Sequence, residues 1–310
     1  MIGEPTRNKI IHSAACAIFG MGCVAAATIS AKPQVLHVQT NLVSILTSVL
    51  DADGRPVVDL PEDSFQISEE GVQQKIERFE AETNQPLDLA LMVDASLSTL
   101  KDLKFEGESA AHFIRQVVRP GDRLGLFSFA DAVDELAGFS DNVPQLRSAA
   151  RKLSPGAGTV LYDALVLGSK ALERLPANRR RVIVLVTDAG ETTSVSKFED
   201  ARREAIASNA LLYSIVIRPI PNESGRNTAG EHALITITDS TGGALFYLDS
   251  MDQLEAMFER IDRELRTQYL LGYYPQPVPP PNVYRHVEVK VKGGVTLHYR
   301  REYLTVRGPK

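Results

Sequence analysis

The chain has 310 residues, of which 44 % are hydrophobic and 24 % are charged, and its formal net charge is −5. This composition is typical of a globular protein of about two domains, with enough apolar side chains to bury a core. Lys and Arg are dispersed along the acidic chain, so it offers no basic stripe for phosphate-backbone contacts. Nucleic acid is therefore excluded as an expected partner.

The first thirty or so residues differ from the rest. Basic residues precede an apolar, alanine-rich stretch at residues 10–29, and small residues follow it, which is typical of a secretory signal peptide. We predict a signal over residues 1–31, cleaved after Ala27 or Ala31, and an exported protein of the periplasm or extracellular space. The alternatives are a buried helix and an uncleaved membrane anchor, because about 20 apolar residues can span a bilayer. Membrane contact is expected only through this segment.

Short strands are expected next, over residues 34–84. The pattern indicates strands at Val35–Leu50, Ser64–Ser68 and Gln74–Phe79, with turn residues between them. A segment this short buries little surface alone, so its partner strands should come from elsewhere in the chain.

The C-terminal residues 269–310 offer those partners. Strands are predicted at Tyr269–Tyr274, His286–Val291 and Val295–Val306, with a proline-rich linker over residues 275–281. We therefore predict one small β-sandwich built from both ends of the chain. The middle of the chain, residues 86–268, would be a domain inserted into it.

Strands and helices are expected to alternate over residues 86–268. Short apolar runs indicate buried parallel strands, and they lie at Leu87–Val93, Leu124–Phe129, Arg181–Val186, Ala210–Ile217 and Ala244–Leu248. The segments with helical spacing are Phe105–Val118, Val143–Lys152, Leu161–Leu175, Phe198–Ser208, Glu231–Ser240 and Met251–Leu265. The predicted fold class is α/β, with a doubly wound, mostly parallel sheet flanked by helices. Such folds bind ligands beyond the carboxyl ends of their strands.

Two acids stand at that position. Asp94 and Asp188 each end a predicted strand, and hydroxyl side chains follow Asp94 at Ser96 and Ser98. Two carboxylates at one edge would repel each other without a cation. Oxygen ligands favour Mg²⁺ or Mn²⁺, with Ca²⁺ as a further option, and argue against zinc. Taken alone, the Asp-x-Ser-x-Ser string is more typical of a helix cap or turn than of a metal site.

The same segments resemble a known family. The run Val93-Asp94-Ala95-Ser96-Leu97-Ser98 resembles the metal-ion-dependent adhesion site of von Willebrand factor type A domains. Gly158-Thr159-Val160-Leu161-Tyr162-Asp163-Ala164-Leu165 is similar to that family's threonine motif, and Val186-Thr187-Asp188 to its closing aspartate. The flanking segments bear a looser resemblance to exported bacterial proteins described from acidobacteria.

The resemblance implies a metal held by Asp94, Ser96, Ser98, Thr159 and Asp188, with a partner protein's carboxylate completing the coordination. It implies a non-enzymatic adhesion or protein-binding module. Many bacterial members have glycine after the closing aspartate, whereas this chain has Ala189, which puts the local loop in question.

Other interpretations stay open. The protein could be a scaffolding subunit of a cell-envelope assembly in which a metal only stabilises loops. A hydrolase is disfavoured, because Ser96 occupies the place where a second acid would follow Asp94. Asp163 either orients the site or only complements a helix dipole. Glu191 is interpreted as part of a polar rim loop, and the run of arginines at residues 179–181 as solvated.

Overall fold

The computed structural model describes residues 42–305, apart from 82, 84, 98–102 and 219–226. All of these described residues belong to one compact unit. The predicted signal peptide over residues 1–31, and Ser98 of the predicted metal site, lie outside the described residues. Among the helices that are described, none is both long and apolar enough to cross a membrane.

A six-stranded sheet forms the centre of the α/β domain, with the strand order β10-β9-β8-β5-β6-β7. The pairs from β10 to β6 are parallel, and β7 is antiparallel to β6. The strands are β5 (Leu87–Asp94), β6 (Arg123–Phe129), β7 (Val133–Ser140), β8 (Arg180–Thr187), β9 (Ala210–Ile217) and β10 (Leu245–Leu248). The prediction of a doubly wound, mostly parallel α/β fold is confirmed.

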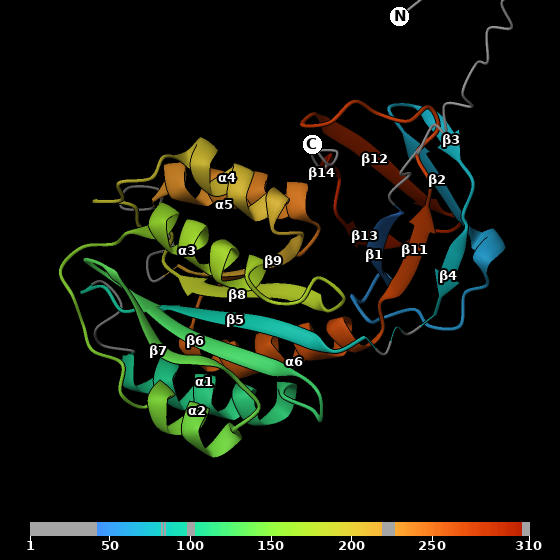
Figure 1. Ribbon diagram of the computed structural model, residues 1–310. Coiled ribbons are helices and arrows are strands. Elements are labelled where there is room, and N and C mark those ends of the chain that lie inside the picture. Colours follow the sequence, from blue (N-terminus) through green and yellow to red (C-terminus); the bar gives the residue numbers. More distant parts are fainter. Residues whose placement is uncertain (1–41, 82, 84, 98–102, 219–226, 306–310) are drawn as a thin grey trace, which may run out of the picture. The chain divides into compact units, whose positions relative to one another are not determined.

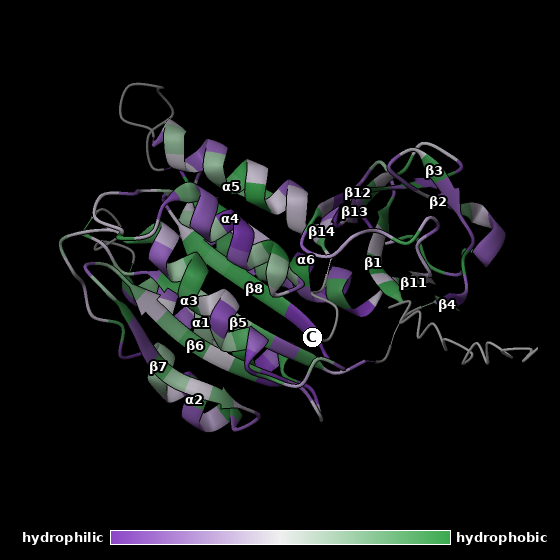
Figure 2. Ribbon diagram, turned by 45° about the horizontal axis from the view of Figure 1, so that its top comes forward, coloured by the Kyte–Doolittle hydropathy of each residue, from purple (hydrophilic) through white to green (hydrophobic). Residues whose placement is uncertain are grey.

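Helices cover both faces of this sheet, with α3, α4 and α5 on one side and α1, α2 and α6 on the other (Figure 1). Strands β5 and β8 are buried along their whole length, and Figure 2 shows hydrophobic residues along much of β8. Burial on both faces explains their nearly continuous apolar sequences. The helices are α1 (Leu103–Val117), α2 (Val143–Ala150), α3 (Leu161–Glu173), α4 (Phe198–Ala207), α5 (Thr228–Thr241) and α6 (Leu254–Arg266).

The edge strand β7 was not predicted. Its residues are partly or fully exposed, and two acids, Asp134 and Glu135, interrupt its apolar pattern. Among the described strands it pairs with β6 alone, and a tight turn at residues 130–132 joins the two. An edge strand of this kind lacks the buried apolar run by which the inner strands are found.

Two further antiparallel sheets come from the two ends of the chain. One has the order β13-β1-β11-β4 and the other β14-β12-β2-β3. Their side chains share one apolar core, which includes Ile45, Ile67, Tyr269 and Val289, so they form the predicted β-sandwich. The strands are β1 (Val43–Leu50), β2 (Phe65–Glu69), β3 (Val72–Gln74), β4 (Arg78–Glu80), β11 (Tyr269–Tyr273), β12 (Tyr284–Val291), β13 (Thr296–Tyr299) and β14 (Glu302–Leu304).

Two predicted strands of the sandwich are each divided between the sheets. The segment Gln74–Phe79 was expected to be one strand, but β3 ends in one sheet and β4 begins in the other. In the same way, β13 and β14 are separated at residues 300–301 and lie in different sheets. Sequence alternation continues across such a corner, so it does not reveal the change of sheet.

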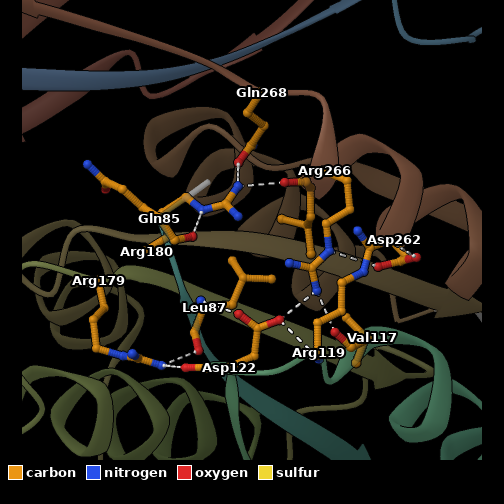
Figure 3. A network of polar contacts seen from close by, with 12 residues as sticks. Gln85, Leu87, Val117, Arg119, Asp122, Arg179, Arg180, Asp262, Arg266 and Gln268 are labelled. Atoms are coloured by element: carbon orange, nitrogen blue, oxygen red, sulfur yellow. Dashed lines mark hydrogen bonds and ion pairs between the residues drawn. The ribbon is translucent and has the colours of Figure 1, made fainter. Parts of the chain in front are cut away.

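The prediction that the arginines at residues 179–181 are solvated is wrong for the last two, which are the first residues of β8. Arg180 and Arg181 are 4 % and 8 % exposed. Arg180 donates to the carbonyl oxygens of Gln85 and Leu265, at 2.8 and 2.5 Å (Figure 3). Burial lowers the pKa of Arg180 to about 10, which still leaves it charged near neutrality. This arginine therefore connects β8 to the segment that precedes β5 and to the last turn of α6.

Candidate functional site

The carboxyl edge of the central sheet brings Asp94 and Asp188 together. Strands β5 and β8 are parallel neighbours, with Val93 paired to Val186. Asp94 is the last residue of β5, and Asp188 directly follows the end of β8 at Thr187. Both acids therefore lie at the edge where doubly wound folds bind their ligands.

Asp94 is completely buried. Its carboxylate accepts hydrogen bonds from the Ser96 backbone N–H at 2.9 Å and the Thr187 hydroxyl at 2.6 Å. Burial raises the pKa of Asp94 to about 6, and the negative charge of Asp188 adds to the rise, although the hydrogen bonds from Thr187 and Ser96 oppose it. A negative charge on Asp94 is thus disfavoured until something positive approaches.

The loop after β5 lies against the loop that precedes α3. Ser96 forms a parallel bridge with Gly156, and the Gly156 N–H donates to the Ala95 carbonyl at 2.9 Å. Ala95 in turn donates its N–H to the Phe129 carbonyl at the end of β6. These contacts place Ser96 and the loop carrying Thr159 at the same edge. The structure does not describe Ser98.

Thr159 and Asp188 each place a side-chain oxygen close to Gly190. A β-carbon on Gly190 would lie 2.9 Å from Asp188 Oδ1 and 3.3 Å from Thr159 Oγ1. The Gly190 N–H also donates to Asp188 Oδ1 at 2.8 Å. Glycine at this position therefore leaves room for the two oxygen atoms, which any side chain would crowd.

Ala189 directly follows Asp188, at the position where the resemblance implied glycine. It adopts a left-handed conformation with φ of 62°, is completely buried, and donates its N–H to the Thr187 hydroxyl at 3.0 Å. A left-handed alanine costs about 1 to 2 kcal/mol. The loop thus has the left-handed turn that glycine would favour, and Ala189 adopts it with local backbone strain.

Two acids fasten the loop after Asp188 to the start of α3. Glu191 accepts hydrogen bonds from the Tyr162 N–H and from both the N–H and the hydroxyl of Ser194. Asp163 accepts from the N–H groups of Val195 and Ser196, at 2.8 Å each. Burial would raise the pKa of Asp163, but these hydrogen bonds outweigh it and hold the pKa below its usual value. Asp163 thus orders the neighbouring loop in addition to lying in a first helical turn.

Sequence reasoning did not identify Asp131. It lies in the turn between β6 and β7, and its carboxylate accepts from the Ala157 N–H at 2.8 Å and the Gly158 N–H at 2.7 Å. The only signal was an acid in a short turn after a buried strand, which is common in loops of every kind.

The donor set at this edge is oxygen. Among the described residues, no group of three or more His, Cys, Asp or Glu side chains could hold a metal ion. A cation between Asp94 and Asp188 would therefore need hydroxyl or water ligands beside the two carboxylates. Ser96 and Thr159, which are 2 % and 4 % exposed, carry hydroxyls on the two adjoining loops.

Comparison with known proteins identifies the central domain. Residues 89–191 match the family model described as von Willebrand factor type A domain. The chain contains a von Willebrand factor type A (VWA) domain. The match begins in β5 and ends just beyond Asp188, so it includes Asp94, Ser96, Thr159 and Asp188 but not residues 192–196 of the following loop. Among curated proteins, none matches the sequence.

Several solved structures are similar to this chain at low sequence identity. A von Willebrand factor type A protein from Catenulispora acidiphila is 10 % identical, with a TM-score of 0.52 over 87 % of this chain and 75 % of its own. A D319A mutant of the PilB minor pilin from Streptococcus sanguinis is 13 % identical, with a TM-score of 0.48 over 59 % of this chain and 62 % of its own. The present chain thus spans less than two thirds of that pilin. The vWF domain of the type V pili tip protein Mfa5 from Porphyromonas gingivalis is 14 % identical, with a TM-score of 0.47 over 58 % of this chain and 95 % of its own.

Proposed function

We propose that this chain is an exported, non-enzymatic protein-binding module whose VWA domain holds a divalent metal and uses it to bind a carboxylate of a partner protein. The proposed metal residues are Asp94, Ser96, Ser98, Thr159 and Asp188, and the expected ion is Mg²⁺ or Mn²⁺, with Ca²⁺ as a further option. A bound ion would supply positive charge and an open coordination position. Export rests on the apolar N-terminal segment at residues 10–29.

The observation that carries this proposal is the pairing of a buried acid with a second acid at one sheet edge. Asp94 is buried and Asp188 lies close enough for its charge to raise the pKa of Asp94. Two adjacent carboxylates are costly unless they are protonated or share a cation. The nearby hydroxyls, and the space that Gly190 leaves between Asp188 and Thr159, suit a small hard cation.

The negative charge of this edge also explains why a partner's carboxylate should bind here only when a metal is present. The loops around the edge carry three further acids, Asp131, Asp163 and Glu191, in addition to Asp94 and Asp188. Without a cation this surface repels an acidic ligand. A divalent cation would offset the charge of the two central acids and so create one point of attraction for an anion.

A hydrolytic role has less support. Phosphatase-like chemistry on a strand-end aspartate needs a nucleophile that is free to attack, with an acid or base beside it. Here the Asp94 carboxylate is buried and accepts from Thr187 and the Ser96 backbone, and Ser96 stands where a second acid would be needed. The geometry favours binding over turnover.

Thermal unfolding tests the metal site. The full chain is melted in chelator and then in millimolar Mg²⁺ or Mn²⁺, beside Asp94→Ala and the control Asp134→Ala, which removes an exposed acid from the edge strand β7. A ligand at about ten times its Kd adds about 1.4 kcal/mol, or roughly 3 to 6 °C. We expect this rise in the wild type and the control but not in Asp94→Ala. Equal behaviour of all three proteins would contradict the proposal.

A second measurement separates a binding role from a purely stabilising metal. Water-proton relaxation of the Mn²⁺-loaded chain is followed while acetate, or the matched neutral ligand acetamide, is added. If acetate displaces bound water and acetamide does not, the metal has an open coordination position that a carboxylate can fill. A metal that raises the melting temperature but responds to neither ligand supports the scaffolding alternative.

A further inference from the structure

The turn between β6 and β7 reaches the loop that carries Thr159. Asp131, at the centre of this turn, directs both carboxylate oxygens at that loop: Oδ2 accepts from Ala157 N–H at 2.8 Å and Oδ1 from Gly158 N–H at 2.7 Å. Successive backbone N–H groups held by one carboxylate form a two-point clamp. Charge-assisted hydrogen bonds of this kind are stronger than neutral ones.

The loop sequence is fitted to this clamp. A β-carbon on Gly156 would lie 2.6 Å from the Ala130 β-carbon and 2.7 Å from Asp131 Oδ2. A β-carbon on Gly158 would lie 3.0 Å from Asp131 Oδ1. These two glycines therefore allow the backbone to approach the carboxylate, which side chains at these positions would prevent.

The clamp acts directly before Thr159. Gly158, whose N–H Asp131 accepts, is the residue directly before Thr159 in the chain. The Thr159 N–H donates to the Thr192 hydroxyl at 2.8 Å, and the Thr159 carbonyl accepts from the Thr192 N–H at 2.9 Å. The backbone on both sides of the Thr159 side chain is thus fixed. One side is held by the β6–β7 turn and the other by the loop after β8.

We propose that Asp131 is a positioning residue for the metal site: by clamping Ala157 and Gly158 it sets the place of the Thr159 hydroxyl, and so favours Mg²⁺ over Ca²⁺. This inference rests on the proposed function. Mg²⁺ demands near-ideal octahedral geometry, whereas Ca²⁺ accepts irregular and longer coordination. Loss of the clamp therefore weakens Mg²⁺ binding more than Ca²⁺ binding.

The test uses Asp131→Asn with Asp134→Asn as its matched control. An asparagine at position 131 keeps one acceptor but turns an NH₂ group toward a backbone N–H, so one of the two hydrogen bonds is lost. The control makes the same change of charge three residues away in β7, where the side chain is exposed. The two variants thus separate the clamp from the overall charge of the edge.

Two measurements are made on the full chain. The affinities for Mg²⁺ and Ca²⁺ are measured by calorimetric titration, and the exchange of the Ala157 and Gly158 amide hydrogens is followed in chelator. Residues that orient metal ligands typically change affinity by about 10- to 100-fold. Because Asp131 is exposed, we expect about a 10-fold loss of Mg²⁺ affinity in Asp131→Asn, a smaller loss for Ca²⁺, and faster exchange of both amides.

The outcomes separate this inference from the proposed function. A wild type that binds neither metal overturns the proposed function, and with it the assignment of Asp131 to a metal site. If the wild type binds metal, two results overturn the assignment of Asp131 alone. In the first, Asp131→Asn keeps both its amide protection and its Mg²⁺ preference. In the second, Asp134→Asn loses as much Mg²⁺ affinity as Asp131→Asn does.

Discussion

Replacing Asp94 by asparagine should make the metal-free protein more stable at neutral pH, although it removes a proposed metal ligand. In the native state burial raises the pKa of Asp94 from 3.8 to about 6. Asparagine has nearly the same shape and carries no charge, so the variant avoids burying a carboxylate. One of the two hydrogen bonds to Asp94 comes from a backbone N–H, which the asparagine carbonyl can still accept.

The magnitude follows from linkage. The native pKa lies above the unfolded one, so the native state binds the proton more tightly and the contribution of Asp94 to stability is fully present below about pH 4. It is lost as the pH rises through 6. A difference of about two pKa units corresponds to roughly 3 kcal/mol.

The assay is denaturant unfolding in chelator at a series of pH values. Other acids of the chain contribute to each profile, so the quantity of interest is the unfolding free energy of Asp94→Asn minus that of the wild type. We expect this difference to rise by roughly 2.5 kcal/mol between pH 4 and pH 7.5. It should disappear or reverse when Mg²⁺ is added, because only the wild type gains from the ion. A difference that is constant with pH in chelator refutes the reasoning.

Three further substitutions have defined outcomes. Gly190→Ala places a β-carbon 2.9 Å from an oxygen of Asp188 and close to Thr159, so calorimetric titration should show at least about a 10-fold loss of Mg²⁺ affinity; unchanged affinity would contradict the geometry given for this edge. Arg180→Met leaves two carbonyl oxygens without their donor and should lower the unfolding free energy by about 2 to 4 kcal/mol in urea, whereas a solvated arginine would change it by less than about 0.5 kcal/mol. Gly242 has a φ of 90°, and a β-carbon there would lie 2.0 Å from a backbone atom, so Gly242→Ala should lower the unfolding free energy by at least about 3 kcal/mol. A variant as stable as the wild type would contradict the packing described at the C-terminal end of α5.

The strands that could be predicted from the sequence are those whose apolar sequence pattern matches their burial in the folded protein. Strands β5, β8 and β9 are buried on both faces, so their apolar runs are long and their ends lie within one or two residues of the predicted ones. The ends of two of these strands also indicated the edge where Asp94 and Asp188 meet, because neighbouring parallel strands end on the same side.

The features that sequence reasoning missed depend on partners far away in the chain. Nothing local distinguishes Arg180 from a solvated arginine, since its hydrogen-bond partners lie 85 and 95 residues away. Asp131 is likewise an ordinary turn residue until the loop with Gly158 is brought beside it. The edge strand β7 is exposed and acidic, and it is ordered by its pairing with β6 and not by an apolar pattern of its own.

The location of a bound ion is the most direct test of the central claim. Crystals of the full chain grown with Mn²⁺ would be measured at a wavelength where manganese scatters anomalously. The account predicts one strong peak between Asp94 and Asp188, within about 2 to 3 Å of hydroxyl or water oxygens, and its loss in Asp94→Ala. Manganese bound elsewhere, or a peak that persists in the variant, would contradict a metal site at the edge of β5 and β8.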